Sequence, residues 1–315
     1  FYSSSAYNYV RKCFQNCLPH PNTIRKWYST VDGSPGYSSE ALNAIKMKAD
    51  ELKKEGKELI CSLIMDERCI RNHVDWNGSR SVGYINFGVH IESDSLPMAK
   101  EALVFLIVGV NCRWKIPIAY FLIASIAADA KANLVKGCLL MLHKAGAKVI
   151  SLTFDGAATN WSMASTLGAD FTPSTLKTYF LHPQTKEEIF IILDPCHVIQ
   201  LLRNALGDWG GFSYSGKQIL WRFFIEMVNL QESEELHLAT KIRRRHVDYR
   251  NEKMKVKLAV QVFSTSVTDA LEYCVKDQGL QQFKHSEATV TFCRTVDKLF
   301  DIFNTRNFLS KNSFR

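Results

Sequence analysis

Residues 59–206 alternate between short apolar runs and amphipathic helical stretches, and this alternation limits the possible folds more than any other feature of the sequence. We expect five strands, at 59–65, 82–89, 102–110, 148–154 and 189–193. The pattern predicts helices at 127–145, 159–167 and from 195 to 206. Three strands followed by alternating helices and strands are typical of a mixed α/β sheet with right-handed crossovers.

The segments on either side of this region have a different spacing of apolar residues, which is helical. Residues 1–57 contain short amphipathic helices, and a helix, a Pro-containing turn and a second helix that opens with Arg25 and Lys26 fit a helix-turn-helix. Many helical hairpins share that pattern. Beyond residue 206 the apolar residues follow helical spacing only. We therefore predict three regions: a helical segment at 1–57, an α/β core at 58–206 and an all-helical domain at 207–315.

The positive charge of the chain is concentrated in one segment. The net charge is +8, and residues 241–257 hold eight basic side chains against two acidic ones. Such a cluster suits a polyanion such as DNA, RNA or a nucleotide phosphate, and a solvated helical face is the alternative. The apolar runs are too short to cross a bilayer. Nine cysteines without a CxxC pair indicate a reduced, cytosolic or nuclear protein.

Three of the expected strands are each followed by an aspartate: Asp66, Asp155 and Asp194. A single Asp at a strand end is usually a turn or cap residue. If the first and fourth strands are parallel neighbours, however, Asp66 and Asp155 emerge side by side at the carboxyl edge of the sheet. Two close carboxylates repel each other and are stabilised by hard cations such as Mg²⁺. Two such ions can activate a water or a 3′-hydroxyl for attack on a phosphodiester.

The order of these elements and the placed aspartates resemble the RNase H-like core of DDE transposases, and more narrowly the P element transposase and its THAP-domain relatives. Leu-Ile-Met-Asp-Glu at 63–67 and Leu-Thr-Phe-Asp-Gly-Ala-Ala-Thr-Asn at 152–160 resemble the two catalytic strands. Asp-Pro-Cys-His at 194–197 fits an Asp-x-x-His signature, and residues 253–259 and 299–306 resemble a GTP-binding helical insertion. The resemblance covers nearly the whole chain.

The resemblance implies a fold: an α/β RNase H-like core with a mixed sheet of strand order 3-2-1-4-5, an N-terminal helical segment that binds DNA, and an all-α insertion domain. It also implies roles in the core. Asp66 and Asp155 become the first two metal-binding acids, and Asp194 orients His197 or supplements the metal site. His197 is expected near the scissile phosphate, with a capped, structural histidine at a helix start as the alternative.

The resemblance further implies that GTP binds in the insertion. Asp301 is expected to contact GTP or its Mg²⁺, and Lys241 and Lys257 are candidate contacts to the phosphates or the base. The sequence contains no GxxxxGK[ST] motif, so such a site is not a P-loop. It would be built from helix termini, lysines and an aspartate.

The implied activity is Mg²⁺-dependent cleavage and transfer of DNA strands in the nucleus, with GTP as cofactor and transposon ends and target DNA as partners. A second copy of the chain is a candidate partner, and no membrane is implied. The family's third acid is a Glu on a helix after the insertion, and no Glu follows Glu287. The zinc-binding THAP domain expected ahead of this region is also missing from the sequence. We therefore expect a fragment that is inactive as given; the alternative is a domesticated DNA- and GTP-binding protein without catalysis.

Overall fold

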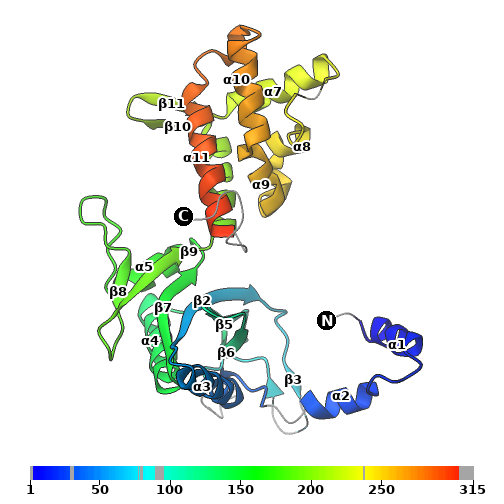
Figure 1. Ribbon diagram of the computed structural model, residues 1–315, viewed down its shortest axis with the longest axis vertical. Helices are drawn as coiled ribbons and strands as arrows, with labels where there is room; N and C mark the ends of the chain where they lie inside the picture. Colours follow the sequence, from blue (N-terminus) through cyan, green and yellow to red (C-terminus); the bar gives the residue numbers. More distant parts are fainter. Residues whose placement is uncertain are drawn as a thin grey trace. The chain divides into compact units, whose positions relative to one another are not determined.

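The computed structural model describes residues 3–28, 32–76, 78, 81–88, 96–236 and 238–304. The chain divides into two compact units, Phe1–Ile192 and Leu193–Arg315 (Figure 1). Each unit has its own hydrophobic core. In the described part of the chain, no helix is both long enough and apolar enough to cross a membrane.

The first unit is built on a seven-stranded mixed sheet of order β1-β6-β5-β2-β7-β9-β8. Its strands are β1 (Gly36–Tyr37), β2 (Leu59–Cys69), β5 (Glu101–Gly109), β6 (Lys115–Ile123), β7 (Ala147–Phe154), β8 (Tyr179–Leu181) and β9 (Glu188–Leu193). β2 runs antiparallel to β5 and parallel to β7. The expected strands at 59–65, 102–110, 148–154 and 189–193 are therefore confirmed.

Helices pack onto this sheet through their apolar faces. The helices of the unit are α1 (Ser4–Cys13), α2 (Pro21–Tyr28), α3 (Ser39–Lys54), α4 (Ala128–Lys144) and α5 (Ala158–Leu167). The hydroxyl of Ser38 caps α3 by accepting a hydrogen bond from the Ala41 amide, as serine often does at this position. α3 contacts β2, β6 and β7, and α4 packs on β7 and α5. In the sheet itself, Phe105 and Phe121 meet edge to face and are fully buried.

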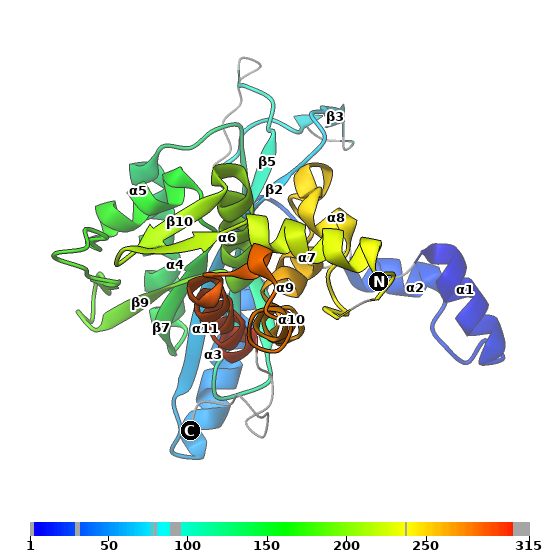
Figure 2. The same cartoon turned by 90° about the horizontal axis from the view of Figure 1, so that it is seen from above.

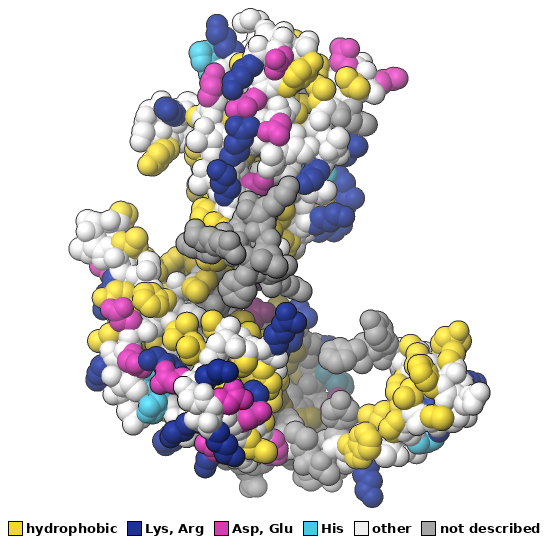
Figure 3. Space-filling view, in the orientation of Figure 1, with side chains coloured by type: hydrophobic (Ala, Val, Ile, Leu, Met, Phe, Trp, Pro, Cys, Tyr) yellow, Lys and Arg dark blue, Asp and Glu magenta, His cyan; other side chains and the backbone are white. Residues whose placement is uncertain are grey.

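The N-terminal helices α1 and α2 form a small helical hairpin around a Pro-containing turn, as the sequence predicts. The second helix begins earlier than expected, at Pro21, so Arg25 and Lys26 lie in its last turn and do not open it. Tyr7 donates a hydrogen bond to the Pro19 carbonyl at 2.8 Å, and Arg11 Nε donates one to the Leu18 carbonyl at 3.0 Å. These bonds fix the turn between the two helices. Apolar side chains remain exposed on this hairpin, including those of Tyr9 and Phe14 (Figure 3).

One predicted strand of the core is wrong. Residues 82–89 do not form a sheet strand: Ser81–Val82 is β4, which pairs only with β3 (Asp75–Trp76), and residue 89 lies outside the described residues. Gly83 and Gly88 adopt φ of +117° and +82°, and these angles interrupt an extended backbone. The place beside β2 belongs to β5, and the apolar run at 116–124 supplies the next strand, β6.

The second unit contains the remaining helices of the described chain. They are α6 (Pro195–Trp209), α7 (Arg222–Ser233), α8 (Arg244–Val247), α9 (Val256–Phe263), α10 (Thr265–Lys276) and α11 (Glu287–Asn304), with short 3₁₀ turns at Tyr249–Glu252 and Gln281–Phe283. α9, α10 and α11 lie side by side in both views (Figures 1 and 2). α6 contributes Ile199 and Leu206 to this core, so the unit begins earlier than the predicted boundary at residue 207.

The expectation of an all-helical second domain is also wrong. β10 (Gly211–Tyr214) and β11 (Lys217–Leu220) form an antiparallel hairpin whose end pair is Tyr214 with Lys217. The two turn residues, Ser215 and Gly216, have φ of +49° and +73°. Positive φ at both central residues is the geometry of the turn that best matches the twist of a hairpin.

Candidate functional site

The aspartates predicted at the carboxyl edge of the sheet lie on adjacent parallel strands. The pairing of β2 with β7 ends with Ile64 opposite Thr153. Asp66 and Asp155 each follow two residues later, so they lie at the same level of the sheet edge. The sequence argument requires that β2 and β7 are adjacent parallel strands, and this is confirmed.

The two carboxylates have different surroundings. Asp155 Oδ1 accepts hydrogen bonds from the Ala157 amide at 3.0 Å and from Asn160 Nδ2 at 2.6 Å, which fixes the start of α5. Among the described residues, Oδ2 of Asp155 has no hydrogen-bond donor. Asp66 is exposed and has no side-chain partner within the same ranges. Three carboxylate oxygens at this edge are therefore available to a ligand.

Behind Asp155 lies a buried polar group that the sequence analysis missed. Lys131 on α4 is 2% exposed; it forms an ion pair with Glu67 and donates a hydrogen bond to Asn160 Oδ1 at 2.7 Å. Asn160 is 1% exposed and in turn contacts Asp155. The only sequence signal was a lysine at a position that faces the core in the helical pattern of residues 128–144.

Asp194 and His197 belong to the second unit, where they form a local pair at the start of α6. Asp194 Oδ1 caps the helix by accepting a hydrogen bond from the Cys196 amide at 2.9 Å. Its Oδ2 lies 2.6 Å from His197 Nδ1, and both side chains are about one-third exposed. Burial and the neighbouring Asp194 raise the pKa of the Cys196 thiol. Asp194 is therefore the N-cap of α6, and His197 lies at the helix start as both readings of this residue expect. Within the described residues, Nε2 of His197 has no hydrogen-bond partner.

The donor chemistry of the sheet edge fits Mg²⁺ in part. Hard cations prefer carboxylate oxygens, and Asp66 and Asp155 offer them at one edge. However, no group of three His, Cys, Asp or Glu side chains in the described ranges is arranged to hold a metal ion. The structure thus brings Asp66 and Asp155 of the first unit to one edge of the sheet, whereas Asp194 belongs to the second unit.

A basic cavity of about 540 Å³ opens in the second unit, between the segment before α8 and the start of α9. Its lining residues are Thr240, Lys241, Arg243, Arg245, His246, Lys255, Val256, Lys257, Leu258 and Gln261. Lys241 and Lys257, which were proposed from the sequence, both line it. In Figure 3, Lys and Arg side chains gather over the α8–α9 side of this unit. Asp301, on α11, is not among the lining residues.

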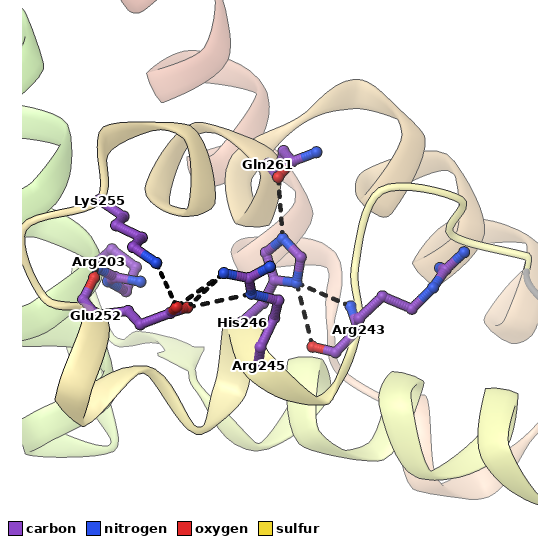
Figure 4. Close-up of polar contacts among 7 residues, drawn as sticks. All are labelled: Arg203, Arg243, Arg245, His246, Glu252, Lys255 and Gln261. Carbon is purple, nitrogen blue, oxygen red and sulfur yellow. Dashed lines mark hydrogen bonds and ion pairs between the residues drawn. The ribbon is translucent and has the colours of Figure 1, made fainter.

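The cations of this cavity fall into two groups. Glu252 accepts hydrogen bonds from Arg245 at 2.8 Å and from Lys255 at 2.6 Å (Figure 4), and these cations lower the pKa of Glu252 to about 2. Lys241 and Lys257 have no acidic partner in the part of the chain that the structure describes. Arg243 donates to the Thr240 and Ile242 carbonyls. Among the described residues, the cavity therefore holds two ammonium groups and one guanidinium group whose charge is not neutralised by a neighbouring carboxylate.

His246 is a structural part of the cavity wall. Its ring is 3% exposed, Nδ1 accepts a hydrogen bond from the Arg243 amide at 3.0 Å, and Nε2 lies 3.1 Å from Gln261 Oε1 (Figure 4). Because an amide oxygen only accepts, Nε2 carries the proton. Burial lowers the pKa of His246, so the ring is neutral at physiological pH and holds the segment before α8 against α9.

Comparison with known families divides the chain into three matches. Residues 1–27 match the family described as transposable element P transposase-like, HTH domain. Residues 33–168 match the TNP-like, RNase H N-terminal domain, and residues 196–315 match the TNP-like, GTP-binding insertion domain.

Curated relatives and a solved structure agree with these matches. The human protein DNA transposase THAP9 is 31% identical over 315 residues, which cover 98% of this chain and 34% of the relative. Transposable element P transposase of Drosophila melanogaster is 27% identical over 304 residues, which cover 96% of this chain and 37% of the relative. The chain thus spans about a third of the length of these relatives. The Drosophila P element transposase strand transfer complex matches with a TM-score of 0.75 and 25% identity, over 99% of this chain and 65% of that one.

Proposed function

Because the chain belongs to the P element and THAP-domain transposase family, we propose that it contributes to Mg²⁺-dependent cleavage and transfer of DNA strands, with GTP as a cofactor. The observation that carries this proposal is the parallel pairing of β2 and β7, which places Asp66 and Asp155 at one edge of an RNase H-like sheet.

In the proposed reaction, Asp66 and Asp155 hold the metal through their free carboxylate oxygens. A divalent ion bound there supplies activation of the attacking hydroxyl and neutralises charge at the phosphodiester. The protein's own contribution is placement: Asp66 is fixed by the pairing of β2 with its neighbours on both sides, and Asp155 is fixed by two N–H donors on Oδ1.

We further propose that His197 contacts the scissile phosphate and that Asp194 orients it. Because a carboxylate only accepts hydrogen bonds, Nδ1 of His197 carries the proton shared with Asp194 Oδ2. In the neutral ring, Nε2 can then accept a hydrogen bond through its lone pair. In the doubly protonated ring, Nε2 can donate a hydrogen bond to a phosphate oxygen. An Asp–His pair of this kind fixes the tautomer of the ring.

For GTP, we propose the basic cavity of the second unit as the binding site for the phosphates. Lys241 and Lys257 are the proposed phosphate contacts because both line the cavity and neither is neutralised by a carboxylate among the described residues. Asp301 remains a proposed contact to GTP or its Mg²⁺. The sequence has no P-loop, so the cavity would bind phosphate through lysines rather than a glycine-rich loop.

The proposed partners are transposon ends and target DNA, contacted in part by the hairpin of α1 and α2, and a second copy of the chain. We place the protein in the nucleus because its proposed substrate is there. Arg25 and Lys26 lie in the last turn of α2 and give this hairpin a basic end.

A cleavage assay tests the catalytic proposal. In a full-length protein that carries this chain, Asp66→Asn or Asp155→Asn is expected to abolish cleavage of a labelled transposon end and to leave binding of that DNA unchanged. Asp50→Asn is the matched control, because Asp50 is an exposed aspartate on α3, away from the sheet edge. Normal cleavage by either variant of the first pair would reject the assignment.

The alternative is a domesticated DNA- and GTP-binding protein without catalysis. The observation that favours it is the lack, among the described residues, of a third acidic, His or Cys side chain that completes a metal site. The same assay separates the two: the alternative predicts DNA and GTP binding by the unmodified protein with no Mg²⁺-dependent cleavage.

A further inference from the structure

We propose that Lys131 and Asn160 are positioning residues that fix the orientation of the Asp155 carboxylate, so that Asp155 presents one free oxygen to a divalent cation. This inference rests on the proposed role of Asp155 as a metal ligand. It adds two side chains to the proposed metal site, and neither touches the metal. Lys131 acts through Asn160, and Asn160 acts through Asp155.

The first contact of the network is an ion pair in the interior of the first unit. The ammonium group of Lys131 is paired with Glu67, whose side chain is 17% exposed and which follows Asp66 on β2. Lys131 Nζ also donates to Asn160 Oδ1 at 2.7 Å and to Thr159 Oγ1 at 3.4 Å. One ammonium group therefore joins β2, α4 and α5.

The lysine also determines which way the Asn160 amide faces. An ammonium group only donates hydrogen bonds, so the carbonyl oxygen of Asn160 must face Lys131. The amide nitrogen is thereby directed to Asp155, where Nδ2 donates to Oδ1 at 2.6 Å. If the Lys131 contact were removed, the hydrogen bond to Asp155 alone would hold the amide in this orientation, and the side chain of Asn160 would be less restricted.

Stability alone does not explain a lysine at this position. The other residues that α4 buries include Ala132, Val135 and Leu139, and an apolar side chain would pack there without loss of hydration. A buried ion pair usually contributes little to stability when compared with apolar residues of similar size. A buried, fully bonded polar network does restrict the geometry of its members. This is the property that a metal ligand requires.

The geometry at Asp155 shows what the network achieves. Oδ1 accepts two hydrogen bonds, from Asn160 and from the Ala157 amide, and these fix the plane of the carboxylate. Oδ2 is the oxygen left for a cation. Mg²⁺ and Mn²⁺ bind well only in a nearly octahedral arrangement, whereas Ca²⁺ tolerates varied geometries. Residues that orient metal ligands typically change metal affinity by 10- to 100-fold when they are mutated.

Titration of the purified chain with Mn²⁺, followed by the electron paramagnetic resonance signal of the free ion, tests the proposal. Asn160→Ala and Lys131→Met are each expected to weaken Mn²⁺ binding by about tenfold or more. Ca²⁺ affinity, measured by competition, should fall less. The sign for Lys131→Met is decisive, because removal of a positive charge would by itself strengthen cation binding. In the double variant the loss should equal that of one single variant, since both residues act through the same hydrogen bond.

Lys148→Met is the matched control, because Lys148 forms an ion pair with Glu187 on the surface of the same unit. Hydrogen exchange of the β7 amides verifies that each variant is folded, and either folded variant decides the question alone. If the unmodified chain binds Mn²⁺ and a folded variant binds it within twofold as tightly, the positioning role of the residue replaced in that variant is overturned and the metal site stands. If the unmodified chain does not bind Mn²⁺ at millimolar concentration, the metal site itself is rejected, and this inference with it.

Discussion

Among the described residues, Arg203 on α6 has the largest fully buried side chain, and its replacement is expected to destabilise the second unit. Its Nη2 donates to the Glu252 carbonyl at 3.2 Å and to the Lys253 carbonyl at 3.0 Å. Its guanidinium lies 4.4 Å from the centre of the Tyr249 ring. Nη1 is buried without a hydrogen-bond partner among the described residues, and burial lowers the pKa of Arg203.

The magnitude for Arg203→Met follows from these contacts. Arg203 makes a third hydrogen bond, from Nε to Asn204 Oδ1 at 2.8 Å. The three hydrogen bonds from this charged donor contribute about 1.5 kcal/mol each at the low end of their range. The stacking on Tyr249 contributes about 1–2 kcal/mol in a desolvated site. Relief of the unpaired Nη1 returns about 1–2 kcal/mol. Since the methionine side chain fills most of the space, the net loss should be about 3.5–5.5 kcal/mol of the free energy of unfolding of this unit.

Hydrogen exchange of the α10 amides measures this loss, because α10 belongs to the second unit and contains neither the mutated residue nor its contacts. Arg222→Met is the control: Arg222 is exposed and lies over the Phe223 ring at 5.0 Å, so its loss should change stability by less than about 0.5 kcal/mol. An equal effect of the two variants would refute the view that Arg203 holds the segment at 252–253.

Two further predictions concern the basic cavity. Lys241→Gln and Lys257→Gln should each weaken the binding of fluorescently labelled GTP by about tenfold, as expected for loss of about 1.4 kcal/mol of phosphate contact. The control Lys217→Gln, on β11, should leave the affinity unchanged. If the two variants bind GTP as tightly as the control in a titration, this phosphate site is rejected. The pKa of Glu252 is lowered to about 2 in the folded protein from an ordinary value of 4.5, so its ion pairs stabilise the fold above pH 4.5 and this contribution disappears as the pH falls to 2. The difference in unfolding free energy between the unmodified chain and Glu252→Gln should shrink over that interval in urea titrations, and a pH-independent difference would contradict it.

The apolar runs predicted most of the central sheet because a strand buried on both faces needs a continuous run of large apolar residues. The strand at 82–89 failed because its alternation is interrupted by Gly83 and Gly88, whose positive φ the pattern does not reveal. The β10–β11 hairpin was missed because its strands are four residues each and were read within a helical region. Ser215 and Gly216 were the available turn signal.

The candidate site was predictable only where it follows strand ends. Asp66 and Asp155 could be placed because parallel strands bring their carboxyl ends together. The network behind Asp155 depends on long-range contacts, such as Lys131 with Glu67, which no local pattern encodes. Lys241 and Lys257 were chosen from a cluster with many cations, and their shared cavity depends on how α8 and α9 fold together. Their role, like that of Asp301 and His197, stays a prediction.

A crystal structure of the full-length protein in Mn²⁺, with anomalous difference density recorded at the manganese edge, tests the central claim most directly. We predict a peak bonded to both Asp66 and Asp155, with Asp155 contributing Oδ2. A peak elsewhere, or a well-ordered sheet edge that stays empty while Mn²⁺ occupies other carboxylates, would contradict the account.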